Sequence, residues 1–171
     1  ARHSFVASLQ KLTHNFFSSH PNLLKGETEG RINILLLGRA GEHYPGKNLT
    51  DTVMVMSIDT HAKKVALLSL PRDLYVPIGD TDLYTKLNAV YQYGISTEEG
   101  ITPLRKTIEA ITGIPIHYFA TVDFDGFEKI VDTLHGINIE VPRDFYDPRY
   151  QEKNYSYETF ELKKGWQILD G

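Results

Sequence analysis

Three apolar runs of strand length lie close together in the first half of the chain, and they constrain its fold more than any other feature. The runs are RINILLLG (31–38), DTVMVMSID (51–59) and KKVALLSLP (63–71), all rich in β-branched and aliphatic residues. Short continuous apolar runs are typical of strands covered on both faces. Because THAK (60–63) is short enough for a hairpin, we expect the second and third strands to be antiparallel neighbours.

Two helical patterns follow these strands. YTKLNAVYQYG (84–94) predicts a short helix ended by Gly94. The next helix is expected to use Thr102 as its N-cap, to carry Pro103 in its first turn and to end at Gly113. One face of this second helix carries Leu104, Ile108 and Ile111.

The second half of the chain continues the alternation. Strand patterns occur in IHYFATVD (116–123), INIEVP (137–142) and ETFELKKG (158–165). The next predicted helix is capped by Asp123 and ends at Gly136. Its apolar side chains are expected to face the interior: Phe127, Ile130, Val131 and Leu134. Residues 143–157 form a polar, Tyr-rich loop in this interpretation, and WQILDG (166–171) opens another helix. Buried strands alternating with helices predict a layered α/β domain around a mixed sheet.

Composition narrows the function classes. The 171 residues include 18 basic and 22 acidic side chains and no cysteine, which gives a net charge of −4. Disulfides and thiolate chemistry are therefore excluded, and a nucleic-acid partner is not expected. Residues 1–30 are predicted to form an amphipathic helix and a linker, and they contain no apolar run long enough to cross a bilayer.

The strand ends carry the candidate chemistry. Asp51 opens the second strand, and Arg72 and Asp73 follow the third, so an antiparallel pair would bring all three to one sheet edge. Carboxylates bind Mg²⁺, and a guanidinium binds phosphate oxygens in a bidentate manner. Lys86 and Asn88 add a positive charge and an amide nearby. The group predicts a site for phosphoryl or pyrophosphoryl groups. The alternative is a solvated turn with an exposed ion pair, which contributes 0 to about 1 kcal/mol.

Six segments in a fixed order resemble the LytR-CpsA-Psr family of bacterial cell-envelope proteins. They are NILLLG, LTDTVMVMSID, KKVALLSLPRDLYVPI, TKLNAVYQYG, GIPIHYFATVDFDGFEKIVDTLHGINIEVP and FELKKGWQILDG. The resemblance implies a three-layer α/β/α sandwich over residues 31–171, which form an LCP-like catalytic domain. The family's further arginines lie beyond a WQILDG-like segment, so we expect the C-terminal part of the domain to be missing from this chain.

The resemblance also implies an activity. Family members are extracytoplasmic phosphotransferases that move a glycopolymer, such as a teichoic acid or a capsular polysaccharide, from a polyprenyl-pyrophosphate carrier. The acceptor is peptidoglycan or a related cell-wall polymer, and the cofactor is Mg²⁺ or Mn²⁺. The prenyl tail is expected in an apolar tunnel between sheet and helices. The implied location is the bacterial cell membrane, held by one N-terminal transmembrane helix that this chain lacks, with the domain facing outward.

Individual residues can be matched to the family pattern. Asp51 matches the metal-binding aspartate, while Arg72 and Asp73 match the catalytic pair, a pyrophosphate-binding arginine and its adjoining acid. The resemblance leaves two roles open for Asp73: it orients Arg72, or it activates the acceptor hydroxyl. Lys86 and Asn88 match a substrate-binding pair.

The loop after the first strand departs from the family pattern. The family usually has an acidic ligand where this chain has Ala40, and an arginine where it has Leu49. Arg39 is the candidate replacement for substrate binding, and Glu42 and His43 are the candidates for the metal. The departures keep two alternatives open: a non-catalytic protein that binds the lipid pyrophosphate or organises the envelope, and a lipid pyrophosphatase.

Overall fold

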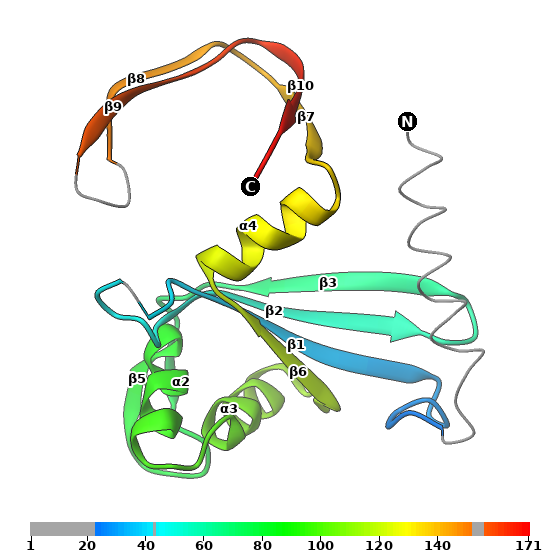
Figure 1. The fold of residues 1–171 in the computed structure, drawn as a ribbon. Coiled ribbons are helices and arrows are strands. Elements are labelled where there is room, and N and C mark those ends of the chain that lie inside the picture. Colours follow the sequence, from blue (N-terminus) through cyan, green and yellow to red (C-terminus); the bar gives the residue numbers. More distant parts are fainter. Residues whose placement is uncertain (1–22, 43, 152–155) are drawn as a thin grey trace. The chain divides into compact units, whose positions relative to one another are not determined.

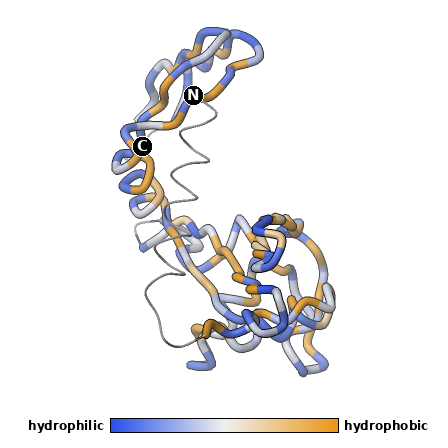
Figure 2. Tube along the Cα trace, turned by 90° about the vertical axis from the view of Figure 1, so that its right-hand side faces the viewer, coloured by the Kyte–Doolittle hydropathy of each residue, from blue (hydrophilic) through white to orange (hydrophobic). Residues whose placement is uncertain are grey.

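The computed structural model describes residues 23–42, 44–151 and 156–171 (Figure 1). Two compact units divide the chain. Among the described residues, 23–39 and 48–121 belong to the first unit, and 40–42, 44–47, 122–151 and 156–171 belong to the second. The helix predicted within residues 1–30 lies outside the described residues. None of the described helices is long and apolar enough to cross a membrane. Apolar and polar residues alternate in short stretches along the described part of the chain (Figure 2).

A four-stranded sheet forms the centre of the first unit, in the order β3-β2-β1-β6 (Figure 1). Its strands are β1 (Arg31–Arg39), β2 (Thr50–Asp59), β3 (Lys64–Leu70) and β6 (Tyr118–Val122). β2 is antiparallel to both β1 and β3, with Val53 paired to Leu70 and Asp59 to Lys64. The predicted hairpin is therefore confirmed, as is the α/β fold around a mixed sheet.

Helices α2 (Leu87–Ser96) and α3 (Thr102–Thr112) pack on one face of this sheet (Figure 1). The shared core consists of strand residues Leu35, Leu37, Val53 and Val55 together with helix residues Leu87, Val90, Leu104 and Ile108, all at most 2% exposed. Burying such a side chain stabilises the fold by about 1.5–3 kcal/mol each. Of the three residues predicted to share one face of α3, Leu104 and Ile108 are buried in this core, whereas Ile111 is 38% exposed.

The predicted helix ends need correction. α2 begins only at Leu87 and continues past Gly94 to Ser96. Gly94 is retained inside the helix because a Cβ there would lie 2.1 Å from the carbonyl oxygen of Gly100. Thr102 is already helical, and Ile101 occupies the N-cap position. Gly113 ends α3 as predicted, in the left-handed region at φ 69°.

A short ribbon precedes α2. β4 (Tyr75–Pro77) pairs antiparallel with β5 (Tyr84–Lys86), and Tyr75 stands opposite Lys86. Lys86 therefore belongs to a strand and not, as predicted, to the helix. The ribbon was missed because each strand has only three residues, although Tyr-Val-Pro and Tyr-Thr-Lys both alternate and GDTDL between them has turn composition.

The second unit contains α4 (Phe124–Thr133) and two strand pairs. β7 (Ile137–Val141) pairs with β10 (Gly165–Leu169), and β8 (Phe145–Gln151) pairs with β9 (Tyr157–Leu162), both antiparallel. Asp123 caps α4 as predicted, because its Oδ1 accepts a hydrogen bond from the Gly126 amide at 2.9 Å.

Three predictions for the second unit were wrong. Of the four residues predicted to face inward from α4, Val131 is buried. More than half of the surface of each of the other three is exposed: Phe127, Ile130 and Leu134. Residues 166–169 of the WQILDG segment belong to strand β10 instead of a helix, because pairing with β7 satisfies their backbone groups. The predicted loop contains β8, in which Pro148 lies at a register shift, where a missing N–H is tolerated.

Candidate functional site

The register of the β2–β3 hairpin places Asp51 and Arg72 together. The pairing ends with Val53 opposite Leu70, and Asp51 and Arg72 each lie two residues beyond that pair at the same end of the hairpin. Arg72 Nη1 donates a hydrogen bond to Asp51 Oδ1 at 2.8 Å. Pro71 ends the ladder there because it has no N–H to donate. The predicted proximity of these two residues is thus observed, and topology alone produces it.

Asp73 lies on the other side of Arg72. Its Oδ2 is 3.6 Å from Arg72 Nε, and its Oδ1 accepts a hydrogen bond from Lys86 Nζ at 2.7 Å. The four residues form a chain of alternating charge, Asp51–Arg72–Asp73–Lys86, which we call the charged cluster. Each side chain is about half exposed, so these ion pairs contribute little to stability and the polar atoms face solvent.

Backbone contacts fix the segment that carries the cluster. The Leu74 amide bonds to the Pro71 carbonyl and closes a turn around Arg72 and Asp73. The amide of Asn88, in the first turn of α2, donates to the Arg72 carbonyl at 3.0 Å. Asn88 is therefore brought to the cluster, where its contact with Arg72 is through the backbone.

Other predicted site residues are placed differently. Arg39, at the end of β1, pairs with Thr50 in the sheet register, next to Asp51, and its Nη1 donates to Asn48 Oδ1 at 3.3 Å. Glu42 belongs to the second unit, where it forms an ion pair with Lys47 at 2.8 Å. His43 lies outside the described residues. Over the part of the chain that the structure describes, no three His, Asp or Glu side chains gather into a metal site.

The Lys86 ammonium lowers the pKa of the Asp73 carboxyl below its ordinary value of 3.8, first through its hydrogen bond and then through its charge, with Arg72 adding to the effect. The pKa of Asp73 is lower in the folded state than in the unfolded state, so its ionised carboxyl stabilises the fold. This stabilisation is fully present above the unfolded-state pKa and is lost as the pH falls through the folded-state pKa. Asp73 is thus an anion at neutral pH.

Removing Lys86 should therefore raise the pKa of Asp73. With Lys86→Met, we expect a carboxyl ¹³C NMR titration to move the Asp73 midpoint up toward 3.8, because the largest cause of the shift is gone. Lys106→Met serves as the matched control, since Lys106 pairs with Asp80. An Asp73 midpoint that stays unchanged in the first variant would contradict the assigned cause.

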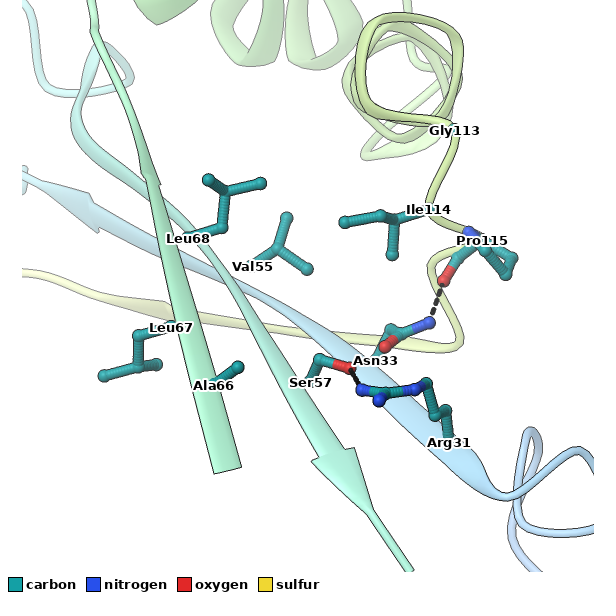
Figure 3. A pocket seen from close by; sticks show the side chains of 10 residues that line it. All are labelled: Arg31, Asn33, Val55, Ser57, Ala66, Leu67, Leu68, Gly113, Ile114 and Pro115. Carbon is teal, nitrogen blue, oxygen red and sulfur yellow. Dashed lines mark hydrogen bonds between the residues drawn. The ribbon is translucent and has the colours of Figure 1, made fainter. Parts of the chain in front are cut away.

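A pocket of about 460 Å³ lies toward the opposite end of β2 (Figure 3). Val55, Leu68 and Ile114 form its apolar wall, while Arg31 donates to Ser57 Oγ at 3.1 Å at its polar side. No residue of the charged cluster lines it. The pocket therefore does not open beside Arg72, and the core residues Leu35, Leu37 and Val53 are at most 2% exposed.

Two tyrosines near the cluster were not among the predicted site residues. Tyr75 and Tyr84 stack on the β4–β5 ribbon with ring centroids 5.6 Å apart and are 71% and 56% exposed. Their only sequence signal was the alternation of the ribbon strands, in which Val76 is buried between Tyr75 and Pro77.

The fold and the site together define an α/β domain whose sheet edge presents an arginine held between two carboxylates. The model of the LytR-CpsA-Psr family matches residues 4–171. The chain belongs to this family, as the sequence predicted.

Curated relatives and solved structures agree. Regulatory protein MsrR of Staphylococcus aureus is 37% identical over 147 residues, which cover 85% of this chain and 40% of MsrR. The polyisoprenyl-teichoic acid–peptidoglycan teichoic acid transferase TagV of Bacillus subtilis is 35% identical over 82% of this chain and 34% of its own. This chain thus spans less than half the length of these relatives.

The fold likeness is equally clear. A crystal structure of B. subtilis TagV has a TM-score of 0.65 and 32% identity, covering 82% of this chain and 52% of that one. A structure of B. subtilis TagT (YwtF) with bound octaprenyl pyrophosphate lipid has a TM-score of 0.61 and 27% identity, covering 83% of this chain and 53% of that one.

Proposed function

We propose that the full-length protein transfers a glycopolymer from a polyprenyl-pyrophosphate carrier to peptidoglycan or a related cell-wall acceptor, on the outer side of the bacterial membrane to which an N-terminal helix anchors it. One observation carries the proposal: Arg72 is held at the sheet edge by Asp51 and Asp73, with Lys86 beside it. Two cations half open to solvent suit a pyrophosphate. The transferase name of TagV and the lipid bound to TagT support the same reaction class.

In this reaction the acceptor hydroxyl oxygen attacks the phosphorus that carries the sugar. The new phosphorus–oxygen bond forms as the bond to the bridging oxygen breaks, polyprenyl phosphate leaves, and the hydroxyl proton passes to solvent. Arg72 and Lys86 stabilise the charge that develops on the phosphoryl oxygens. Asp73 is assigned to hold these two cations in place, because a carboxylate with a lowered pKa is a weak general base.

The donor set also suits a divalent cation. Mg²⁺ is commonly held by one or two carboxylates together with substrate phosphate oxygens and water. Asp51 is the carboxylate we assign to it, since it lies at the cluster and is half exposed. When bound, Mg²⁺ or Mn²⁺ would supply Lewis-acid stabilisation of the phosphate oxygens.

The pocket of Figure 3 is the place we assign to part of the apolar tail. Ser57, which lines the pocket, is six residue steps along β2 from Asp51, a distance of about 20 Å. A tail reaching from the cluster to this pocket along the same face would need core side chains to separate. Each CH₂ group of the tail that becomes buried would contribute about 0.8 kcal/mol, which would offset the cost of separating the core side chains.

The test uses the full-length protein with a polyprenyl-pyrophosphoryl disaccharide and a peptidoglycan oligosaccharide. We expect polyprenyl monophosphate and glycosylated acceptor to form in equal amounts, and the rate to fall about tenfold or more on chelation and to recover with Mg²⁺ or Mn²⁺. If water, and not the sugar hydroxyl, accepts the glycan phosphate, the protein is a pyrophosphatase instead. Binding without any release would indicate the non-catalytic alternative suggested by Ala40 and Leu49.

A further inference from the structure

An aromatic platform adjoins the charged cluster. On the β4–β5 ribbon, Tyr75 stands opposite Lys86 and Pro77 opposite Tyr84, so these four residues share one face, and Val76 points into the core from the other. The two tyrosine rings stack with an interplanar angle of 24°. With 71% and 56% of their surfaces exposed, both rings keep area open to a ligand.

Lys86 links the platform to the cluster. Its Cβ is about 5 Å from that of Tyr75, as expected for directly opposed residues of an antiparallel pair. Its Nζ bonds to Asp73, whose other oxygen faces Arg72. A ligand whose anionic part is held by Arg72 and Lys86 would therefore place its next group over the tyrosines.

We propose that Tyr75 and Tyr84 form the binding platform for the first sugar ring attached to the pyrophosphate. This inference rests on the proposed function. A pyranose ring has an apolar face of C–H groups, which packs on an aromatic ring by dispersion and through the negative ring face. A cation next to an open aromatic face thus matches a sugar phosphate, which is anionic at one end and flat and weakly apolar at the other.

The prenyl end of the carrier is the competing occupant, because it is also apolar. The two occupants differ in one respect that an experiment can use. A platform for the sugar discriminates between carriers with and without a sugar, whereas a platform for the prenyl chain binds both equally.

The experiment measures the affinity of the full-length protein for two probes, polyprenyl pyrophosphate and polyprenyl-pyrophosphoryl-N-acetylglucosamine. With Tyr84→Ala we expect about five- to tenfold weaker binding of the sugar-bearing probe and unchanged binding of the sugar-free probe. Tyr84→Phe should bind both as the unaltered protein does, because it keeps the ring. Leu83→Ala, a neighbouring exposed apolar residue, is the matched control and should change neither affinity.

Other outcomes overturn the inference in different ways. Equal weakening of both probes by Tyr84→Ala, or no weakening of either, would exclude the sugar platform while the proposed function stands. If the unaltered protein binds neither probe, or if Arg72→Ala leaves both affinities unchanged, the proposed function fails and the platform with it.

Discussion

Replacing Arg72 by alanine should lower glycan transfer by the full-length protein by about 100- to 1000-fold. This range corresponds to the loss of one preorganised donor to a charged transition state, about 2.7–4 kcal/mol. The loss should appear in turnover more than in folding, because Arg72 is 54% exposed and its solvent-screened ion pairs contribute little to stability. Steady-state transfer assays and thermal unfolding of the same samples would measure both.

Two further variants separate the role of Arg72 from a general effect of charge. Arg72→Lys keeps the charge but loses the planar fork, so we expect intermediate turnover. Arg105→Ala removes a positive charge from α3, where Arg105 pairs with Glu109 at 3.3 Å, and turnover should stay within about twofold because such a surface pair contributes little. Turnover of Arg72→Ala within threefold of the unaltered protein would contradict the assignment.

Replacing Leu35 by alanine should lower the free energy of unfolding by about 3 kcal/mol. Leu35 is 0% exposed at the centre of β1, in the core shared by the sheet and the helices. Truncation removes buried methyl groups and leaves a cavity that close-packed neighbours cannot fill, and such substitutions cost about 2–5 kcal/mol. Urea denaturation followed by far-UV circular dichroism would measure the change.

The control for this prediction is again Leu83→Ala. Leu83 is 57% exposed, so the same truncation should change the unfolding free energy by less than about 0.5 kcal/mol. Similar losses in the two variants would show that the sheet–helix core is not the main source of stability.

The central sheet could be predicted because its signals are local. The runs that became β1, β2 and β3 are continuous and apolar, and the short connection between the last two permits only an antiparallel pair. The same argument predicted that Asp51 and Arg72 meet, since their distance from the hairpin turn is equal on both strands. Asp123 was recognisable as a cap because a carboxylate ahead of a helical pattern satisfies free amides locally.

Where long-range pairing decides the conformation, the sequence pattern failed. WQILDG has no local feature that excludes a helix, and only the opposing strand β7 makes it extended. The helical spacing of its neighbours predicts that Lys86 is part of a helix, but Lys86 pairs with Tyr75 of β4 and is the last residue of strand β5. Gly94 resembles a helix end, yet it lies inside α2, where a Cβ would collide with the Gly100 carbonyl oxygen.

The sequence by itself determined the class of fold, the family and the identity of the charged residues, because strand periodicity, turn composition and residue chemistry are properties of short segments. Only the tertiary structure decided the order of charges along Asp51, Arg72, Asp73 and Lys86, and the position of the stacked tyrosines beside them. The physical reason is that side-chain contacts between strands depend on register. Register is set by the pairing of segments distant in the chain, and no short segment contains that information.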